Sequence, residues 1–98
     1  MTMPAYLIFV RDEVVDAASH DEYLSLAPAT FAGTKGRLVA FDNNPVVKEG
    51  AKPDGVVIVE WPTIEEALSH YESEAYQRIV DLRTGGAKGR LLIVNGLD

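Results

Sequence analysis

The sequence predicts an α+β protein of the ferredoxin-like class, with elements in the order β-α-β-β-α-β and two helices on one face of a four-stranded antiparallel sheet. Three observations lead to this prediction. Four short segments rich in β-branched and aromatic residues are bounded by turn residues. Helical spacing of apolar residues appears after the first of these segments and again after the third. The length of 98 residues allows one domain, spanning residues 1–98.

The predicted strands cover residues 6–11, 37–41, 56–61 and 90–95. Gly36, Gly55 and Gly89 each stand directly before a strand. Because glycine adopts positive φ without steric cost, we expect these three positions to turn the chain sharply. They therefore mark the boundaries of strands.

The first helix is predicted between the first two strands. Asp16 and Ser19 are both suited to cap its N-terminus. Pro28 falls inside the helical pattern and removes a backbone donor, which predicts a kink or a restart at that point. The buried face is predicted from apolar residues at helical spacing: Tyr23, Leu26 or Ala27, and Phe31.

The second helical region follows the third strand. Thr63 and Glu66 form a capping box, so a helix begins there. Ser73 is predicted to cap a second short helix that ends at the glycine pair 85–86. The long connection 43–55 joins the second and third strands, and its residues 46–48 are candidates for an extra hairpin arm.

The strands are apolar on both faces, although the helices cover only one. In the first strand one face carries Tyr6, Ile8 and Val10, and the other carries Leu7 and Phe9. A face of four such strands measures about 320 Å², and an apolar patch of that size on a small protein usually marks an interface. We therefore expect a homodimer that pairs through the open sheet face. The alternative is a monomer whose segment 43–55 folds over the sheet.

Charge and composition exclude several classes of protein. Fifteen acidic against nine basic residues give a net charge of -6, which disfavours a nucleic-acid or anionic-membrane partner. The longest apolar run, residues 5–10, is far shorter than the ~20 residues that cross a bilayer. The start Met-Thr-Met-Pro lacks the basic region of a secretory signal, so a cytoplasmic location is expected. Without cysteine there is no disulfide and no thiolate chemistry.

No cofactor or metal is expected. His20 lies in the first turn of the first helix, where we expect it to be exposed, and His70 stands four residues after Glu66. Neither histidine has a second ligand at metal-binding spacing. A single axial histidine such as His70 is all that a haem requires, but nothing in the sequence specifically supports one. The glycine-rich stretch 85–89 lacks the spacing of a phosphate-binding loop.

Polar residues at the ends of apolar strands are the candidates for chemistry. Glu60 is the candidate catalytic residue: in an apolar wall its pKa would rise, as a general base requires, unless Arg37 or Arg90 pairs with it. The alternative is a salt bridge at the rim of the sheet. The candidate ligand-binding residues are Arg37, Trp61, Tyr71, Ser73, Tyr76 and Arg90. Tyr71 also fits an ordinary core position, and Ser73 an ordinary cap.

Several motifs together resemble the family called domain of unknown function 1330. They are the opening Pro4-Ala5-Tyr6, Asp16 with Tyr23, Gly36-Arg37, and above all Val59-Glu60-Trp61-Pro62 followed by Tyr71-x-Ser73-x-x-Tyr76-Gln77. The resemblance implies membership of the dimeric α/β-barrel superfamily. That superfamily includes cofactor-free monooxygenases, isomerases, haem-dependent relatives and amino-acid sensors, so the fold alone does not fix an activity.

Two functions follow as hypotheses. The first is a homodimer that binds a small aromatic or carbonyl compound and performs cofactor-free acid-base or oxygenase-like chemistry, with Glu60 as base and Arg37 or Arg90 stabilising negative charge. The second is a non-catalytic ligand-sensing or protein-interaction module built on the same dimer. A third use of the fold is assembly alone, with the acidic surface keeping the protein in solution.

Overall fold

The computed structural model describes residues 3–97 and contains one four-stranded antiparallel sheet in the order β2-β3-β1-β4. This strand order and the element order confirm the ferredoxin-like prediction. The strands are β1 (Ala5–Val14), β2 (Arg37–Asp42), β3 (Gly55–Trp61) and β4 (Ala87–Asn95). The helices are α1 (Ala17–Leu26), the 3₁₀ helix η1 (Ala27–Phe31), α2 (Ile64–Tyr71), α3 (Glu74–Gln77) and α4 (Val80–Gly86).

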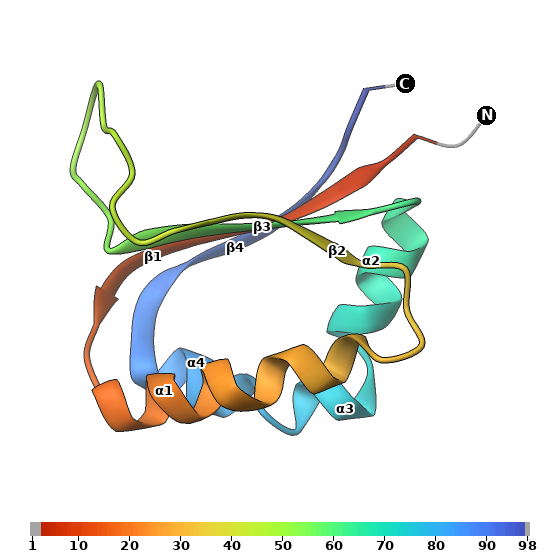
Figure 1. Cartoon of the computed structure of the whole chain (residues 1–98), viewed down its shortest axis with the longest axis horizontal. Helices are drawn as coiled ribbons and strands as arrows, with labels where there is room; N and C mark the ends of the chain where they lie inside the picture. Colours follow the sequence, from red (N-terminus) through yellow and green to blue (C-terminus); the bar gives the residue numbers. More distant parts are fainter. Residues whose placement is uncertain (1–2, 98) are drawn as a thin grey trace.

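All the helices lie on one side of the sheet (Figure 1). Helices α1, η1, α3 and α4 form a layer facing the sheet, and α2 lies between this layer and one end of the sheet. The loop between β2 and β3 rises at the other end, on the side away from the helices. It does not cross the open face and contains no strand, so residues 46–48 do not form the hairpin arm considered from sequence. No helix within residues 3–97 is long and apolar enough to span a membrane.

The strand register assigns each side chain to one face of the sheet. Leu7 stands opposite Val59, and Phe9 opposite Val57, on the face that the helices cover. Alternate residues face the other way, since strand side chains have a period of two. The open face therefore carries the pairs Tyr6 and Glu60, Ile8 and Ile58, and Val10 and Val56. The core beneath the helices is formed by Ala5, Leu7, Val59, Trp61 and Ala67.

The caps are close to those expected. Asp16, rather than Ser19, caps α1 by accepting a hydrogen bond from the Ser19 amide. The helix restarts as η1 with Pro28 in its first turn, as the proline predicted. Thr63 caps α2 by accepting from the Glu66 amide. Ser73 caps α3, but the predicted single helix is interrupted: α3 ends at Gln77 and α4 begins at Val80, with the buried Ile79 between them.

The glycines before the strands serve close packing instead of a positive φ. Among residues 3–97, only Gly33 and Gly50 have positive φ. A Cβ on Gly36 would stand 2.6 Å from the Trp61 ring, and one on Gly55 would overlap the Arg11 guanidinium. The expectation of sharp turns at these positions was therefore wrong: Gly36 directly precedes β2, Gly55 begins β3, and Gly89 lies within β4, where the extended backbone needs no positive φ.

Candidate functional site

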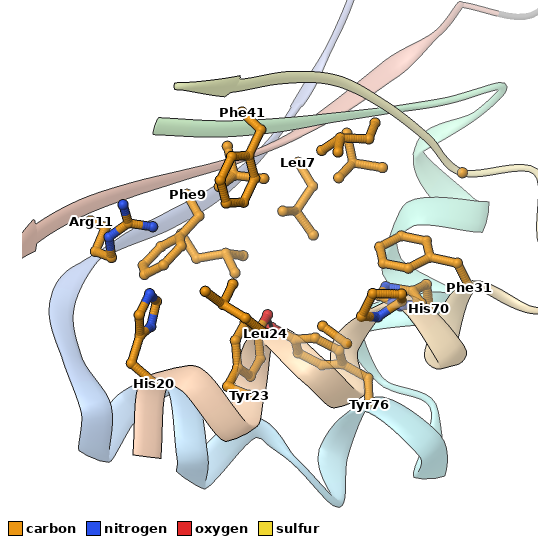
Figure 2. Close-up of a pocket in the computed structure, with 17 residues that line it drawn as sticks. Leu7, Phe9, Arg11, His20, Tyr23, Leu24, Phe31, Phe41, His70 and Tyr76 are labelled. Carbon is orange, nitrogen blue, oxygen red and sulfur yellow. Dashed lines mark hydrogen bonds between the residues drawn. The ribbon is translucent and has the colours of Figure 1, made fainter. Parts of the chain in front are cut away.

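A cavity of about 350 Å³ lies between the sheet and the helix layer (Figure 2). Its size falls in the range of small-molecule sites. The sheet contributes Leu7 and Phe9 from β1, Val57 and Val59 from β3, and Leu91 from β4. Leu38 and Phe41 of the edge strand β2 also line the cavity and remain 58% and 46% exposed. The cavity therefore opens to solvent past β2.

Helix α1 forms the opposite wall, because its lining residues recur at helical spacing. His20, Tyr23, Leu24 and Ala27 follow at i, i+3, i+4 and i+7, which places them on one side of the helix. Pro28 and Phe31 continue the wall through η1. His20 is only 6% exposed, so the expectation that it lies in solvent was wrong. It faces the sheet because it occupies the first position of this inward series.

His70 stands at one end of the cavity within a cluster of aromatic rings. Its ring centroid lies 4.3 Å from Phe31, 5.0 Å from Trp61 and 5.0 Å from Tyr76. Burial lowers the pKa of His70, so the ring is neutral near pH 7. The surrounding rings hold the imidazole in place.

The hydrogen bonds around Thr30 define which nitrogen of His70 carries the proton. Thr30 Oγ1 donates to the carbonyl of Ala27 at 2.7 Å and lies 2.9 Å from His70 Nε2. Because the hydroxyl has one proton and gives it to Ala27, this arrangement favours Nε2 as the donor to Thr30. Nδ1 is then unprotonated, and it is buried without a hydrogen-bond partner. His70 thus presents a free acceptor in an aromatic setting.

A buried hydrogen-bonded trio spans the helix layer. The Tyr23 and Tyr76 hydroxyls lie 2.8 Å apart, and Arg83 Nε donates to the Tyr76 hydroxyl at 3.1 Å. Burial and the neighbouring Tyr76 raise the pKa of Tyr23, so the Tyr23 phenol stays protonated at neutral pH. The Arg83 guanidinium also lies 5.1 Å from the centre of the Phe9 ring, a cation–π contact.

Arg11 and His20 stand side by side at the end of the cavity opposite Phe31 and His70 (Figure 2). Arg11 Nη2 donates to Asn43 Oδ1 at 2.6 Å and to the Asp54 carbonyl at 3.1 Å. Arg11 Nε and His20 Nδ1 are buried without a partner. Burial, followed by the charge of Arg11, lowers the pKa of His20. This end of the cavity therefore carries one fixed cation and one neutral imidazole.

The predicted catalytic residue Glu60 lies elsewhere, on the open face. Arg37 Nη2 donates to Glu60 Oε1 at 2.6 Å, and the Tyr6 hydroxyl donates to Oε2 at 3.2 Å. The Arg37 bond, and then the Tyr6 bond, lower the pKa of Glu60 below its usual range. This arrangement matches the salt bridge at the rim, which was the alternative considered from sequence.

The other predicted residues are spread over the fold. Arg90 lies on the open face at the end of the sheet away from Glu60, with its Nε 4.0 Å from Asp12 Oδ2. Trp61 is 1% exposed and packs behind Phe31 and His70. Ser73 caps α3, and Tyr71 packs 5.5 Å from Tyr76. Of the predicted set, the structure places Tyr76 in the wall of the cavity.

Arg11 was not among the residues predicted for the site, and no specific role was predicted for His20 or His70. A signal was present for Arg11, because it continues the inward series Leu7, Phe9 with a period of two. Among residues 3–97 no cluster of side chains is suited to hold a metal ion.

These features define a class: a ferredoxin-like α+β domain with an apolar, aromatic cavity between sheet and helices and a few buried polar groups at its ends. The chain belongs to the family described as Domain of unknown function (DUF1330), whose profile matches residues 4–97. No curated protein matches it significantly.

Several crystal structures share the fold. A protein of unknown function from Rhodopseudomonas palustris is 19% identical, with a TM-score of 0.74 over 100% of this chain and 85% of its own. SnoaB, a cofactor-independent oxygenase from Streptomyces nogalater, is 11% identical, with a TM-score of 0.65 over 100% of this chain and 96% of its own. A dimeric ferredoxin-like protein from Thermobifida fusca is 8% identical, with a TM-score of 0.64 over 97% and 91%.

Proposed function

We propose that this protein is a homodimer that binds a small ring-bearing organic molecule in the cavity between the sheet and the helices. The observation that carries this proposal is the cavity itself. Its walls are apolar and aromatic, and the residues at its ends include three buried polar atoms without partners: Arg11 Nε, His20 Nδ1 and His70 Nδ1. Buried polar atoms are usually hydrogen-bonded, and these three have almost no exposed surface, so a small turn of each side chain would bring them to groups on a bound molecule.

The open sheet face supports the homodimer. Ile8, Val10, Val56 and Ile58 occupy its centre, and Leu92 and Val94 remain 47% and 39% exposed. Removing such a surface from water stabilises association by roughly 25 cal/mol per Å² of apolar area, before the entropic cost of association. The polar pairs Arg37 with Glu60, and Asp12 with Arg90, lie toward opposite ends of this face. A second copy with the same apolar centre is a complementary partner.

The proposed chemistry in the cavity is cofactor-free acid-base catalysis with His70 as the base. A neutral imidazole with an unprotonated, unpartnered Nδ1 is suited to accept a proton from a phenol or an activated carbon of a bound ring compound. Because Nδ1 has almost no exposed surface, this step requires the His70 ring to turn toward the compound. Tyr76 supplies a hydroxyl within the same wall, and Trp61 supports the His70 ring from behind. The description of SnoaB as a cofactor-independent oxygenase is consistent with chemistry of this kind on this fold.

Native mass spectrometry of freshly purified protein tests the assembly and any retained ligand together. We expect a dimer, with extra mass where a ligand survives purification. A monomer at micromolar concentration contradicts the proposed assembly. The cytoplasmic location expected from the sequence stays a prediction.

Binding is tested with the fluorescence of the single tryptophan, Trp61, which packs against the cavity residues Phe31 and His70. Titration with naphthalene derivatives is expected to change this fluorescence saturably. Ala27→Phe fills the cavity and is expected to abolish the change. The matched control is Ala18→Phe, at an exposed position of α1 outside the cavity. Equal binding by both variants contradicts the site.

The second candidate function is a ligand-sensing module without turnover. The observation that favours it is the position of Glu60, whose carboxylate is paired with Arg37 outside the cavity. Incubation of a bound compound with the protein, followed by mass analysis of the compound, separates the two functions. Conversion that is lost in His70→Gln and kept in Glu60→Gln supports catalysis in the cavity. An unchanged compound supports sensing.

A further inference from the structure

Arg11 is a buried cation without a carboxylate partner. It is 4% exposed, and its two hydrogen bonds go to neutral groups, the Asn43 amide oxygen and the Asp54 carbonyl. Within residues 3–97, no carboxylate lies within 4.0 Å of its guanidinium. Both of these hydrogen bonds come from Nη2, and Nε has none.

The neighbouring groups do not supply the missing negative charge. His20 is neutral near pH 7, because burial and the charge of Arg11 both lower its pKa. Arg83, the second buried arginine, is also free of a carboxylate partner among the described residues and lies over the Phe9 ring. Arg83 is hydrogen-bonded to the Tyr76 hydroxyl and is not among the residues that line the cavity, so Arg11 is the buried cation that a bound molecule can reach.

A buried charge is costly unless it is paired and hydrogen-bonded. The surface of this protein has an excess of acidic residues, with a net charge of -6, yet none of the described acidic side chains reaches Arg11. The uncompensated cation lines the cavity, where a bound molecule can approach it. An anionic group on that molecule would pair with the guanidinium and receive hydrogen bonds from it.

We propose that the molecule bound in the cavity is a ring-bearing carboxylate, with its carboxylate on Arg11 and its ring toward Phe31, His70 and Tyr76. This inference rests on the proposed function and assigns a substrate class to the same cavity. The two ends of the cavity fit the two parts of such a molecule. One end holds the cation and His20, and the other holds the aromatic cluster (Figure 2).

The test compares two probes of nearly equal shape on the full wild-type chain. 2-Naphthoate is an anion at pH 7.5, and 2-naphthamide is neutral. We expect naphthoate to bind at least about tenfold more tightly, as a charge-assisted hydrogen bond in a dry site allows. Calorimetry or Trp61 fluorescence measures both dissociation constants. This comparison uses only the wild-type protein, so misfolding of a variant cannot affect it.

Variants then assign the preference to Arg11. Arg11→Gln is expected to reduce the preference for naphthoate to about twofold or less, with naphthamide binding little changed. The matched control, Arg78→Gln, removes an exposed arginine of a helix-surface ion pair and is expected to keep the full preference. Circular dichroism and urea unfolding establish that each variant is folded.

The outcomes separate the two proposals. Naphthamide binding as tightly as naphthoate overturns the carboxylate inference and leaves the cavity as a site for neutral ring compounds. A preference that survives in folded Arg11→Gln overturns the role of Arg11. Absence of binding by both probes at millimolar concentration overturns the inference and the proposed function together.

Discussion

Gly36 lies directly against the indole ring of Trp61, and a Cβ at this position would stand 2.6 Å from Cη2 and 2.8 Å from Cζ2. The start of β2 is thus fixed by the ring at the end of β3. The same ring packs behind Phe31 and His70, so the contact also sets the aromatic end of the cavity.

Gly36→Ala is expected to destabilise the protein by about 1–3 kcal/mol, because the buried Trp61 ring would have to shift out of its packing against Phe31 and His70 to admit the methyl group. Urea unfolding at fixed protein concentration measures the change. Gly85→Ala is the control, since a Cβ there meets no atom within 4 Å. We expect the free energy of unfolding of this control to equal that of the wild type or to exceed it by up to about 1 kcal/mol. An equal loss in both variants contradicts the explanation by close packing.

Tyr76→Phe is expected to cost more than Tyr23→Phe. Removing the Tyr76 hydroxyl leaves the buried Arg83 Nε without its acceptor, a loss of about 1–3 kcal/mol. Removing the Tyr23 hydroxyl leaves the bond between Arg83 and Tyr76 in place, and we expect about 0.5–1.5 kcal/mol. Unfolding free energies of the two variants give the order, and the reverse order contradicts the network described above.

The pH dependence of stability is expected to reflect the two buried histidines. Burial lowers the pKa of His20 and of His70 in the folded state, so below about pH 6.5 the unfolded chain binds more protons than the folded one. Stability is therefore lost as the pH falls from about 6.5, by up to about 1.4 kcal/mol per pH unit for each histidine. Urea unfolding between pH 7.5 and 5.5 measures this slope.

His70→Gln provides the control for the pH series, because glutamine does not titrate. We expect this variant to be less stable at pH 7.5 but to show a smaller slope below pH 6.5. A slope equal to that of the wild type would mean that His70 is protonated as readily in the folded state as in the unfolded chain.

His70 is expected to carry its proton on Nε2 at pH 7. The bond from Thr30 to Ala27 leaves Thr30 Oγ1 free only to accept, which favours that tautomer. Nitrogen chemical shifts of the imidazole report the tautomer directly. Thr30→Val removes the acceptor and is expected to shift the populations toward a mixture, whereas Thr84→Val, on the exposed surface of α4, leaves them unchanged.

Ile58→Glu is expected to convert the proposed dimer to a monomer. Ile58 lies opposite Ile8 at the centre of the open face, and a carboxylate there cannot be buried without a partner. Light scattering during size-exclusion chromatography gives the mass. Leu68→Glu, on the exposed part of α2, is the control and should stay dimeric. A dimer in both variants would place the interface elsewhere.

The fold was largely predictable because its signals are local. The capping box at Thr63 and Glu66, the proline within the first helical pattern and the four apolar segments each act over a few residues. The prediction failed where a distant neighbour decided the outcome. Position 36 needs a glycine because the Trp61 ring of the neighbouring strand β3 occupies the space of a Cβ. The predicted single helix is interrupted between α3 and α4, where Ile79 is buried.

The site was less predictable, because strand register across the long 43–54 loop is not written in local sequence. The structure places Arg37 opposite Glu60, and Arg90 opposite Val10 toward the far end of the same face. Whether Arg37, Glu60 and Arg90 share a face could not be predicted; the structure places all three on the face away from the cavity. Arg11 looked like the polar end of an apolar run, and only the pairing of β1 with its neighbours shows that it points inward.

The alternation of side chains along β1 separates two properties that evolution or an engineer can change independently. Positions 7, 9 and 11 face the cavity, whereas positions 6, 8 and 10 face the opposite side of the sheet. A substitution in the first set alters what fits between sheet and helices without touching the exposed face, and one in the second set does the opposite. Within a single ten-residue strand, a lineage can thus change the cavity while keeping the exposed face, or change the exposed face while keeping the cavity.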